Sequence, residues 1–503
     1  MERAEIPDLI RLKWERFHSQ GTLRVIDLFS GAGGMSLGFK AAGYEILGGI
    51  ENDPQAASTY ALNFHHDLTA SANLDTQARD ITKTDPVEFV ASLCPGATPE
   101  TVADVIIGGP PCQAFARIGR AKLREITGDP EGYKRDERAR LYAHFLHYVR
   151  RLRPIVVVME NVPDILNYGG HNIADEICET LDDEGYECRY TLLNAVHFGV
   201  PQLRERFFLI GISREIGITP SFPTPTHHCQ LPHGYKGIRR FALKRARKAV
   251  QQDAPDACFF VLPTEPNDGL PESPTVELAI GDLPPITWHL EGLPPSRAQR
   301  GDKLARYRDD FEPSAYALAM RAWPGYEASE GVCDHLIRYL PRDYPIFARM
   351  RPGEQYPEAR VHALELFAEK LNELRARGED IQDGSDRYHE IMKLTVPPYD
   401  PGKFPNRWRK LRPDAPAHTL TAHLGKDSYS HIHYDDAQAR TISVREAARL
   451  QSFPDGFRFV GGMNAALRQI GNAVPPLLAK AIAEHLATLL RPSPVTLTVE
   501  TAL

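Results

Sequence analysis

Short apolar runs alternate with amphipathic stretches over the first 214 residues of the chain. The apolar runs predict buried strands at residues 23–29, 45–50, 104–107, 155–159, 190–195 and 207–210. Stretches with apolar residues at helical spacing lie between them and predict helices at residues 35–42, 141–152 and 173–181. Because strands and helices alternate, we expect an α/β fold with a doubly wound sheet.

This pattern fades after residue 214, where proline becomes frequent and no repeat is detectable. Order returns near the C-terminus, where Ser443 and Glu446 have the spacing of a capping box at a helix start. Residues 477–490 have Ala and Leu at the spacing of a packed helix face. We therefore expect one regular domain, one irregular domain and a C-terminal segment that completes the first.

Composition limits the partners of this chain. Its 503 residues are enough for two to three domains, and a net charge of −7 excludes a surface that is basic throughout. Seven cysteines without a CxxC pair, and no signal sequence, favour a reducing cytoplasm. No apolar run approaches the roughly 18–20 residues of a membrane span.

A glycine turn and an acid at a strand end indicate a nucleoside site. Residues 30–34 are Ser-Gly-Ala-Gly-Gly and follow the first predicted strand, and Glu51 ends the second. Glycines let the backbone approach a ligand closely, and a carboxylate suits ribose hydroxyls. Asp80 could supply a further acidic contact, although it also fits a surface turn. A dinucleotide enzyme is the alternative, but Ser36 stands where its fingerprint has the third glycine.

Reactive side chains follow three later strands. Cys112 comes after Gly-Gly-Pro-Pro at a strand end, where open α/β sheets carry their chemistry, and a nucleophilic thiol needs a lowered pKa or an assisting base. Glu160 ends an all-apolar strand, where burial is costly unless the carboxyl is partnered or protonated. Arg204 and Arg206 are expected to point to the same side of an extended segment. For Pro-Cys alone, the alternative is a structural loop with an incidental cysteine.

Two local basic runs occur in this acidic chain. Residues 236–248 hold seven positive charges and no acid, and residues 403–412 interleave Phe404 and Trp408 with basic side chains. Such runs suit nucleic-acid phosphates, although a solvated helix face is the alternative. A histidine cluster around residue 229 fits no zinc-binding spacing, so no metal is expected.

Together these segments resemble the DNA (cytosine-5) methyltransferases, in that family's usual order. The matching segments are residues 27–34, 109–113, 160–162, 202–206, 412–421, 450–454 and 471–476. One match would be weak, but five in register (residues 27–34, 109–113, 160–162, 202–206 and 471–476) are specific, and with the other two segments the set spans residues 24 to about 490. Ala116-Arg117 departs from the family, which often has serine after Cys-Gln-x-Phe, and this concerns a minor loop contact.

The resemblance implies S-adenosylmethionine as methyl donor and a thiolate mechanism. Cys112 would attack carbon 6 of a cytosine extruded from the duplex. Glu160 would hold ring nitrogen 3 and the amino group, with a pKa raised by burial. Arg204 would face the base carbonyl, and Arg206 would orient the site. The polar loop at residues 113–140 would close over the base.

The resemblance also assigns binding residues. Phe29 would stack on adenine, Glu51 would take the ribose hydroxyls, and Asp80 would take the adenine amino group. The whole set expected at the cofactor is Phe29, Ser30, Gly31, Ala32, Gly33, Gly34, Glu51, Asn52, Asp80, Ile81, Pro110, Asn472 and Val474. The set expected at DNA is Gln113, Arg239, Arg240, Lys244, Arg245, Arg407, Arg409, Thr419 and Thr421.

The implied organisation is a Rossmann-like catalytic domain with a smaller, irregular target-recognition domain. The expected divisions are an N-terminal extension at residues 1–22, the S-adenosylmethionine-binding domain at 23–214, the recognition domain at 215–465, a segment at 466–490 that completes the catalytic domain, and a tail at 491–503. We expect a cytoplasmic monomer that methylates a specific sequence in double-stranded DNA, without a membrane partner. Restriction–modification or phage defence is the expected setting, with a restriction nuclease as a candidate partner.

Three other functions are alternatives. An amino-methyltransferase would use an Asp/Asn/Ser-Pro-Pro-aromatic loop, which residues 395–399 imitate, but Val396 cannot accept a hydrogen bond from an amino group. A transfer-RNA cytosine-5 methyltransferase has a compact recognition lobe, whereas the lobe expected here is long. A catalytically silent DNA-binding regulator would not need Cys112, Glu160 and Arg204 together.

Overall fold

The chain divides into two compact units. The computed structural model describes residues 6–64, 78–111, 140–167, 172–232, 239, 259–292, 303–403, 405–425 and 429–491. Unit 1 comprises Met1–Gly199, Glu205–Glu272 and Val474–Leu503, and unit 2 comprises Val200–Arg204 and Ser273–Ala473.

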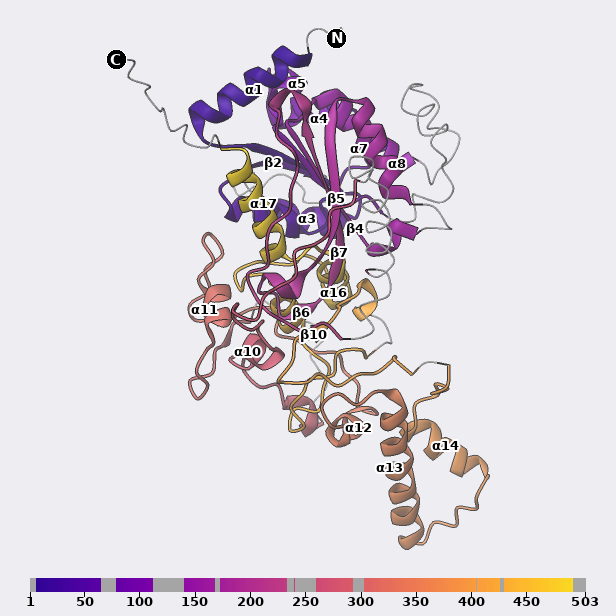
Figure 1. The fold of residues 1–503 in the computed structure, drawn as a ribbon. Helices are drawn as coiled ribbons and strands as arrows, with labels where there is room; N and C mark the ends of the chain where they lie inside the picture. Colours follow the sequence, from indigo (N-terminus) through magenta and orange to yellow (C-terminus); the bar gives the residue numbers. More distant parts are fainter. Residues whose placement is uncertain are drawn as a thin grey trace, which may run out of the picture. The chain divides into compact units, whose positions relative to one another are not determined.

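Among the described residues, a six-stranded sheet with the order β2-β1-β3-β4-β7-β5 forms the centre of unit 1 (Figure 1). Its strands are β1 (Arg24–Leu28), β2 (Glu45–Ile50), β3 (Val105–Gly108), β4 (Val156–Asn161), β5 (Tyr186–Asn194) and β7 (Glu205–Ser213). The first four are parallel, whereas β7 is antiparallel to both β4 and β5. The six strands predicted from the apolar runs are thereby confirmed. Both β3 and β4 are buried along their whole length, as expected for strands covered on two faces.

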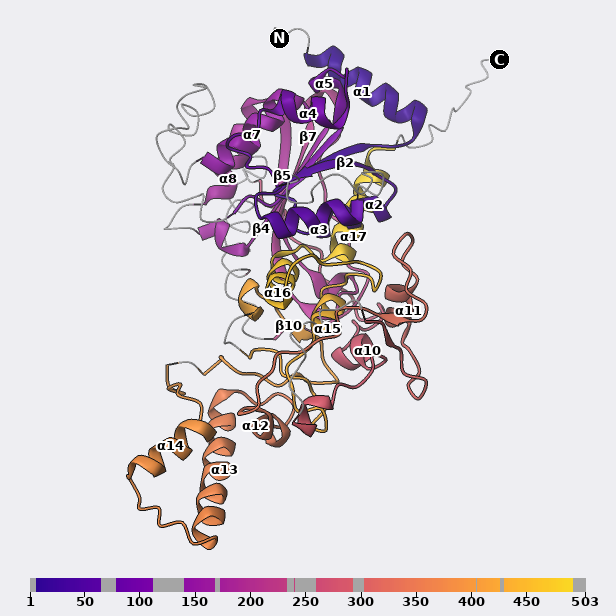
Figure 2. The same cartoon turned by 180° about the vertical axis from the view of Figure 1, so that it is seen from behind.

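Helices cover both faces of this sheet. They are α2 (Gly34–Ala41), α3 (Pro54–Phe64), α4 (Pro86–Leu93), α5 (Pro99–Val102), α7 (Arg140–Leu152), α8 (Ile173–Asp183) and α17 (Pro476–Leu489). Helices α7 and α8 lie on one side, and α2, α3 and α17 lie on the other (Figure 1, Figure 2). The C-terminal α17 is held against the connection between α2 and β2, because Tyr44 donates a hydrogen bond to the carbonyl oxygen of Ala483 at 3.0 Å.

The N-terminal extension is part of unit 1 rather than an appendage. Helix α1 (Ile6–Gln20) buries Lys13, which is 1% exposed. Its Nζ donates to the carbonyl oxygens of Ala103 (2.7 Å), Leu152 (2.8 Å) and Arg153 (2.8 Å). These acceptors lie before β3 and at the end of α7, so one buried ammonium joins the extension to two other segments.

The boundary of unit 1 lies at residue 272 rather than at 214. After β7 the chain returns to the edge strand β5, where Tyr190 accepts from Val261 N at 2.8 Å and donates to Phe259 O at 2.9 Å through its backbone. This pairing is formed by an irregular segment, so no periodic apolar pattern predicted it. The first residues of the predicted C-terminal segment differ too, because residues 466–473 belong to unit 2.

Unit 2 is built mainly from short elements. They are β6 (Gln202–Leu203), β8 (Ala305–Arg306), β9 (Gly331–Val332), β10 (Ala417–His418), α10 (Val276–Ile280), α11 (Ala315–Arg321), α12 (Tyr344–Arg349), α13 (Tyr356–Ala376), α14 (Asp386–Thr395), α15 (Val444–Leu450) and α16 (Met463–Asn472). Strand β6 pairs in parallel with β10, and β8 pairs with β9. The predicted capping box at Ser443 and Glu446 is confirmed at the start of α15.

A buried ionic network stabilises unit 2 beside its apolar core. The guanidinium of Arg449 is fully buried and pairs with Asp282 at 2.9 Å and with Asp455 at 2.6 Å. An apolar cluster around Trp408 and Phe347 packs α12 and α13 together. No helix in the described part of the chain is long and apolar enough to span a membrane.

Candidate active site

The turn between β1 and α2 is tightly constrained. Phe29 has φ of 63°, a left-handed conformation that is uncommon outside glycine and is often found at functional sites. Gly33 has φ of 92° and precedes α2, and a Cβ atom there would collide with the ring of Phe64. Glycine is therefore required at this position for both conformation and space.

Glu51 directly follows β2 and binds the backbone of this turn. Its Oε2 accepts from the backbone N–H of Gly31 at 2.9 Å, and its Oε1 accepts from the N–H of Asp53 at 2.7 Å. Burial raises the pKa of Glu51, and these hydrogen bonds oppose that rise. The adjacent Asn52 is exposed. The strand-end acid and the glycine turn predicted from the sequence are thus in direct contact.

A pocket adjoins these residues. It is lined by Ser30, Gly49, Glu51, Ala57, Tyr60, Ala61, Arg79, Phe89 and Leu93. The hydroxyl of Ser30 is buried and has no hydrogen-bond partner within the described structure. A buried hydroxyl without a partner is costly, so a polar ligand group at this position would satisfy it. The pocket thus combines a carboxylate, a hydroxyl and an apolar wall.

Asp80 and Ile81 lie at the edge of this region. The Asp80 carboxylate accepts from Thr82 N at 2.9 Å and from Thr82 Oγ1 at 2.7 Å, and Lys83 lies 3.5 Å away. Ile81 is buried in the core. Asp80 therefore caps a turn and is not among the residues that line the pocket.

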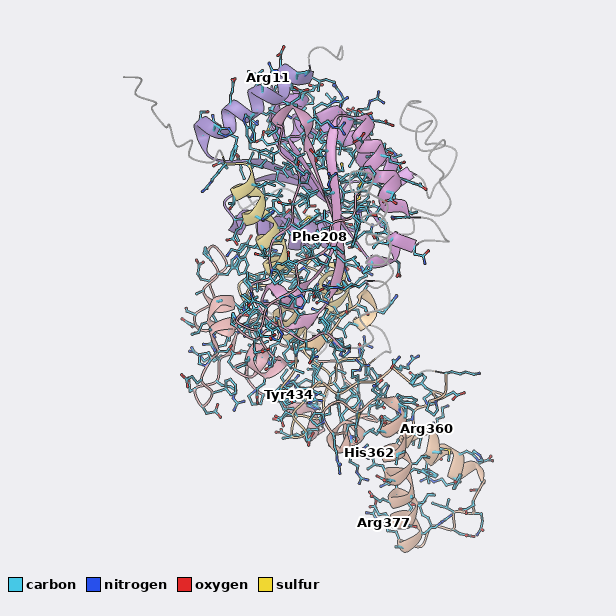
Figure 3. The ribbon with its side chains drawn as sticks, in the orientation of Figure 1. Arg11, Phe208, Arg360, His362, Arg377 and Tyr434 are labelled. Atoms are coloured by element: carbon cyan, nitrogen blue, oxygen red, sulfur yellow. The ribbon has the colours of Figure 1, made fainter. Side chains whose placement is uncertain are left out.

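A second group of residues meets at the carboxyl ends of β3 and β4. The Nε of Arg206 lies 3.1 Å from Oε1 of Glu160, and both side chains are mostly buried. Antiparallel pairing explains this meeting, because Phe208, which is labelled in Figure 3, is the register partner of Glu160, and Arg206 precedes it by two residues. The carboxylate also lies against Gly109, where a Cβ atom would be 3.1 Å from Oε2 of Glu160.

The loop that leads to Cys112 is held at the same place. Asn161 donates from Nδ2 to the carbonyl oxygen of the buried Pro110 at 2.8 Å. Gly109 precedes Cys112 by three residues, so the backbone before the cysteine is fixed beside Glu160. Cys112 and Gln113 lie outside the described residues.

Arg204 does not share the site of Arg206, and the expectation that they point to the same side is wrong. The extended chain is interrupted at Arg204, between β6 and β7, and these two strands belong to different sheets. Arg204 is 1% exposed, and its guanidinium donates to backbone carbonyl oxygens of Leu420, Gly471 and Ala473. The arginine beside Glu160 is therefore Arg206, whereas Arg204 binds backbone within unit 2.

The predicted DNA contacts divide into several groups. Arg239 is 6% exposed and pairs with Glu205 at 3.6 Å and Glu265 at 2.5 Å, so its placement on an exposed basic stripe is wrong. Arg240, Lys244 and Arg245 lie outside the described residues.

In the second basic run, alternate side chains face inward. Trp408 and Lys410 are buried, and the Nζ of Lys410 donates to Phe347 O at 2.8 Å. Arg407 and Arg409 are half-buried, and the guanidinium carbon of Arg407 lies 3.7 Å from the ring centroid of Tyr399. The run is thus partly a core segment, which its composition did not indicate.

The two threonines predicted to contact DNA are differently exposed. Thr419 donates from Oγ1 to Leu203 O at 2.6 Å, whereas Thr421 is exposed. Asn472 is exposed at the end of α16, and Val474 is buried.

Sequence reasoning missed several residues near these groups. Tyr60 and Arg79 line the pocket, and Gln202 and Gln451 hold the backbone around Arg204. Gln202 and Asn161 belong to segments that the motifs identified, so their position in a motif was an available signal. Tyr60 lies on an apolar helix and carried no such signal.

Comparison with known proteins identifies the family. The model for "C-5 cytosine-specific DNA methylase" matches residues 23–256 and 349–488. M.OihORF3336P of Oceanobacillus iheyensis is 39% identical over 466 residues, which cover 92% of this chain and 94% of that protein. Type II methyltransferase M.AgeI of Thalassovita gelatinovora is 32% identical over 478 residues, covering 92% and 98%.

The fold agrees with this assignment. A prophage-encoded E. coli protein of known crystal structure superposes with a TM-score of 0.56 at 23% identity, covering 93% of this chain and 99% of that one. The amino-methyltransferase and transfer-RNA alternatives are less consistent with a family model for carbon-5 methylation of DNA. The chain belongs to the C-5 cytosine-specific DNA methylases and is a DNA (cytosine-5-)-methyltransferase.

Proposed function

We propose that this enzyme transfers a methyl group from S-adenosylmethionine to carbon 5 of a cytosine within a specific sequence of double-stranded DNA. The observation that carries the proposal is the convergence of Gly109, Glu160 and Arg206 at the ends of β3, β4 and β7. This arrangement supports a cytosine site, because Gly109 leads directly to the predicted nucleophile Cys112.

The residues around Glu51 fit the proposed cofactor. Glu51 would accept hydrogen bonds from the ribose hydroxyls, and Ser30 would use its buried hydroxyl to bind a polar group of the same ligand. Phe29 would contact the adenine ring. The bound cofactor would supply an electrophilic methyl group. Asp80 supports adenine binding less directly, because its carboxylate already accepts two hydrogen bonds from Thr82.

The chain's own residues would prepare the cytosine for methylation. Cys112, as a thiolate, would add to carbon 6 and make carbon 5 nucleophilic, and later loss of the carbon-5 proton to a base would break the sulfur–carbon bond and restore the ring. Glu160 would bind the amino group and hold a proton at ring nitrogen 3. Arg206 would donate hydrogen bonds to the base carbonyl, where negative charge develops, and would keep Glu160 in position through their ion pair. This assignment exchanges the two arginine roles expected from the sequence.

The names of the relatives support a role in restriction–modification. M.AgeI is named as a type II methyltransferase, and a methyltransferase of this kind protects host sites from a partner nuclease. The proposed partners are therefore double-stranded DNA and, in the cell, a cognate restriction nuclease or another phage-defence protein.

Three experiments test the proposal. Bisulfite sequencing of DNA from cells that express the enzyme should reveal methylated cytosines in one sequence context, and transfer RNA incubated with the enzyme should gain no methyl group. A duplex with 5-fluorocytosine at the target position should trap the wild-type enzyme as a covalent adduct, because the fluorine cannot leave carbon 5. Cys112→Ser should form no adduct while retaining DNA binding. Unmethylated DNA together with no adduct would support a silent DNA-binding regulator instead.

A further inference from the structure

Arg204 joins two segments of unit 2 that are far apart in the sequence. Its Nη1 donates to the carbonyl oxygen of Leu420 at 2.7 Å. Its Nη2 donates to the carbonyl oxygens of Gly471 at 2.9 Å and Ala473 at 3.0 Å. Leu420 lies between the two threonines predicted to contact DNA, and Gly471 and Ala473 flank Asn472, which is predicted to contact the cofactor.

Two glutamines form a second connection between the same segments. Gln202 accepts from Leu420 N at 2.9 Å through Oε1 and donates to Gln451 Oε1 at 2.5 Å through Nε2. Gln451 then donates to Ala473 O at 2.5 Å. The side chains of Gln202, Gln451 and Arg204 are all buried, so their hydrogen bonds are shielded from water.

The two backbone segments are also in direct contact. A Cβ atom at Gly471 would collide with the carbonyl group of Thr421, so glycine permits the close approach. A displacement of residues 419–421 would therefore have to displace residues 471–473 or break the hydrogen bonds of Arg204. The guanidinium is planar and rigid, which makes it a stiff connection.

We propose that Arg204 is a positioning residue that couples DNA binding to cofactor binding. This inference rests on the proposed function and on the sequence-based expectation that Thr419 and Thr421 contact DNA and Asn472 contacts the cofactor. DNA that fixes the first segment would order the second through Arg204, and the cofactor would act on the first segment in return, because coupling between two ligands is reciprocal. Arg204 would thus act on both ligands without touching either.

The test measures the affinity for S-adenosylhomocysteine by calorimetry, with and without a duplex that carries the target sequence found by bisulfite sequencing. For the wild type we expect the duplex to raise this affinity by about fivefold or more, at the lower end of typical allosteric coupling. For Arg204→Lys we expect less than about a twofold change, because a single ammonium cannot reproduce the forked contacts. Without DNA, this variant should keep most of its affinity.

Arg445→Lys is the matched control. Arg445 is equally buried in unit 2 and donates to the backbone carbonyl oxygens of Cys333, Pro454 and Phe457, none of which lies in the coupled segments. This control should retain wild-type coupling. Gln451→Met is a second variant, to be used if Arg204→Lys does not fold. It removes the Ala473 hydrogen bond and should lower the coupling partially.

The outcomes separate this inference from the proposed function. Wild-type coupling in a folded Arg204→Lys, or in a folded Gln451→Met where Arg204→Lys cannot be obtained, would overturn the positioning role. An equal loss in Arg445→Lys would also overturn it, because the loss would then reflect general destabilisation. A wild type that binds both ligands without coupling would overturn this inference alone. A wild type that binds no S-adenosylhomocysteine would overturn the proposed function as well.

Discussion

Arg206 and Glu160 form an ion pair at the carboxyl end of β4, with 3.1 Å between Nε and Oε1. The Arg206 and Glu160 side chains are 13% and 12% exposed, so the pair is largely shielded from water. Each group orients the other, and Glu160 lies against Gly109, which leads to Cys112. This arrangement makes the pair the best structural candidate for the groups that hold the cytosine.

Arg206→Ala should lower turnover by about two to three orders of magnitude, the scale of a lost donor to a developing oxyanion. Glu160→Gln should lower turnover by about two to four orders of magnitude, as expected for a general acid–base group. The double variant should lose less than the product of the two effects, because both residues act on one ring in one transition state. Initial-rate measurements with saturating cofactor provide the comparison.

Arg189→Ala is the control for this series. Arg189 lies on β5 of the same sheet and pairs with Glu187 at 3.4 Å, away from the carboxyl end of β4. Its replacement should leave turnover near the wild-type value. Multiplicative effects of Glu160→Gln and Arg206→Ala would show that the two groups act at separate steps.

Glu51 gives a prediction about the pH dependence of cofactor binding. Burial raises the pKa of Glu51, and only the ionised carboxylate can accept hydrogen bonds from both ribose hydroxyls. The affinity for S-adenosylhomocysteine should therefore decline as the pH falls toward the raised pKa. Glu51→Gln should bind more weakly by about 1.5–3 kcal/mol at pH 7.5 and should lose most of this pH dependence. Calorimetric titrations from pH 5 to pH 8 provide the measurement. If Glu51→Gln showed the same pH dependence of affinity as the wild type, Glu51 would not be a cofactor-binding residue.

Asp27 gives a prediction about the pH dependence of stability. Burial raises the pKa of Asp27 to about 7, with nearby Glu51 adding to the rise and a hydrogen bond from Ser36 at 2.6 Å opposing it. The folded protein therefore holds this proton more tightly than the unfolded chain, and the stability that Asp27 contributes is lost as the pH rises through about 7. Between pH 6 and pH 8 this loss is on the order of 1 kcal/mol.

Asp27→Asn cannot titrate and should therefore lose less stability than the wild type over this interval. Urea unfolding at pH 6 and pH 8 gives the difference, with Glu45→Gln as a control that removes an exposed carboxyl from the same sheet. An identical pH dependence in the wild type and Asp27→Asn would mean that Asp27 is ionised in the folded protein.

The sequence predicted the sheet well because its strands are continuous apolar runs, and it identified Glu51 and Glu160 because acids at strand ends are conspicuous. The expectation that Arg204 and Arg206 point to the same side was wrong because side-chain direction was inferred from an unbroken extended segment, and the break between β6 and β7 has no local signal. The boundary at residue 272 was missed for a related reason. An irregular segment joined β5 through backbone hydrogen bonds, which depend little on residue type.

Lys13 gives a prediction about the N-terminal extension. Burial lowers the pKa of Lys13 to about 7, so the effect is best measured at pH 6, where the ammonium is charged. Lys13→Met would leave three buried carbonyl oxygens without their donor and should lower the free energy of unfolding by about 2–4 kcal/mol. Arg11→Met on the exposed face of the same helix (Figure 3) should change it by less than about 0.5 kcal/mol. Equal effects of the two variants on the free energy of unfolding would mean that the buried hydrogen bonds of Lys13 do not anchor α1 to the rest of unit 1.

The last prediction concerns the basic run at residues 236–248. We expect one of its residues to stabilise the fold and three others to bind DNA. Arg239 is buried and paired with Glu205 and Glu265, so Arg239→Ala should destabilise the protein and leave the salt dependence of DNA binding unchanged. Arg240, Lys244 and Arg245 are predicted to contact phosphates. Replacing these three residues with alanine should flatten the plot of log affinity against log salt concentration by up to roughly 0.9 for each lost contact.

Both variants should be compared by fluorescence anisotropy on one duplex at several salt concentrations, and by urea unfolding. The expected pattern is a change in stability alone for Arg239→Ala and a change in salt slope alone for the triple variant. A wild-type slope in the triple variant would identify the run as a solvated surface, and DNA affinity would then have to come from other residues. A reduced slope in Arg239→Ala at wild-type stability would mean that the buried ion pairs of Arg239 open when the enzyme binds DNA.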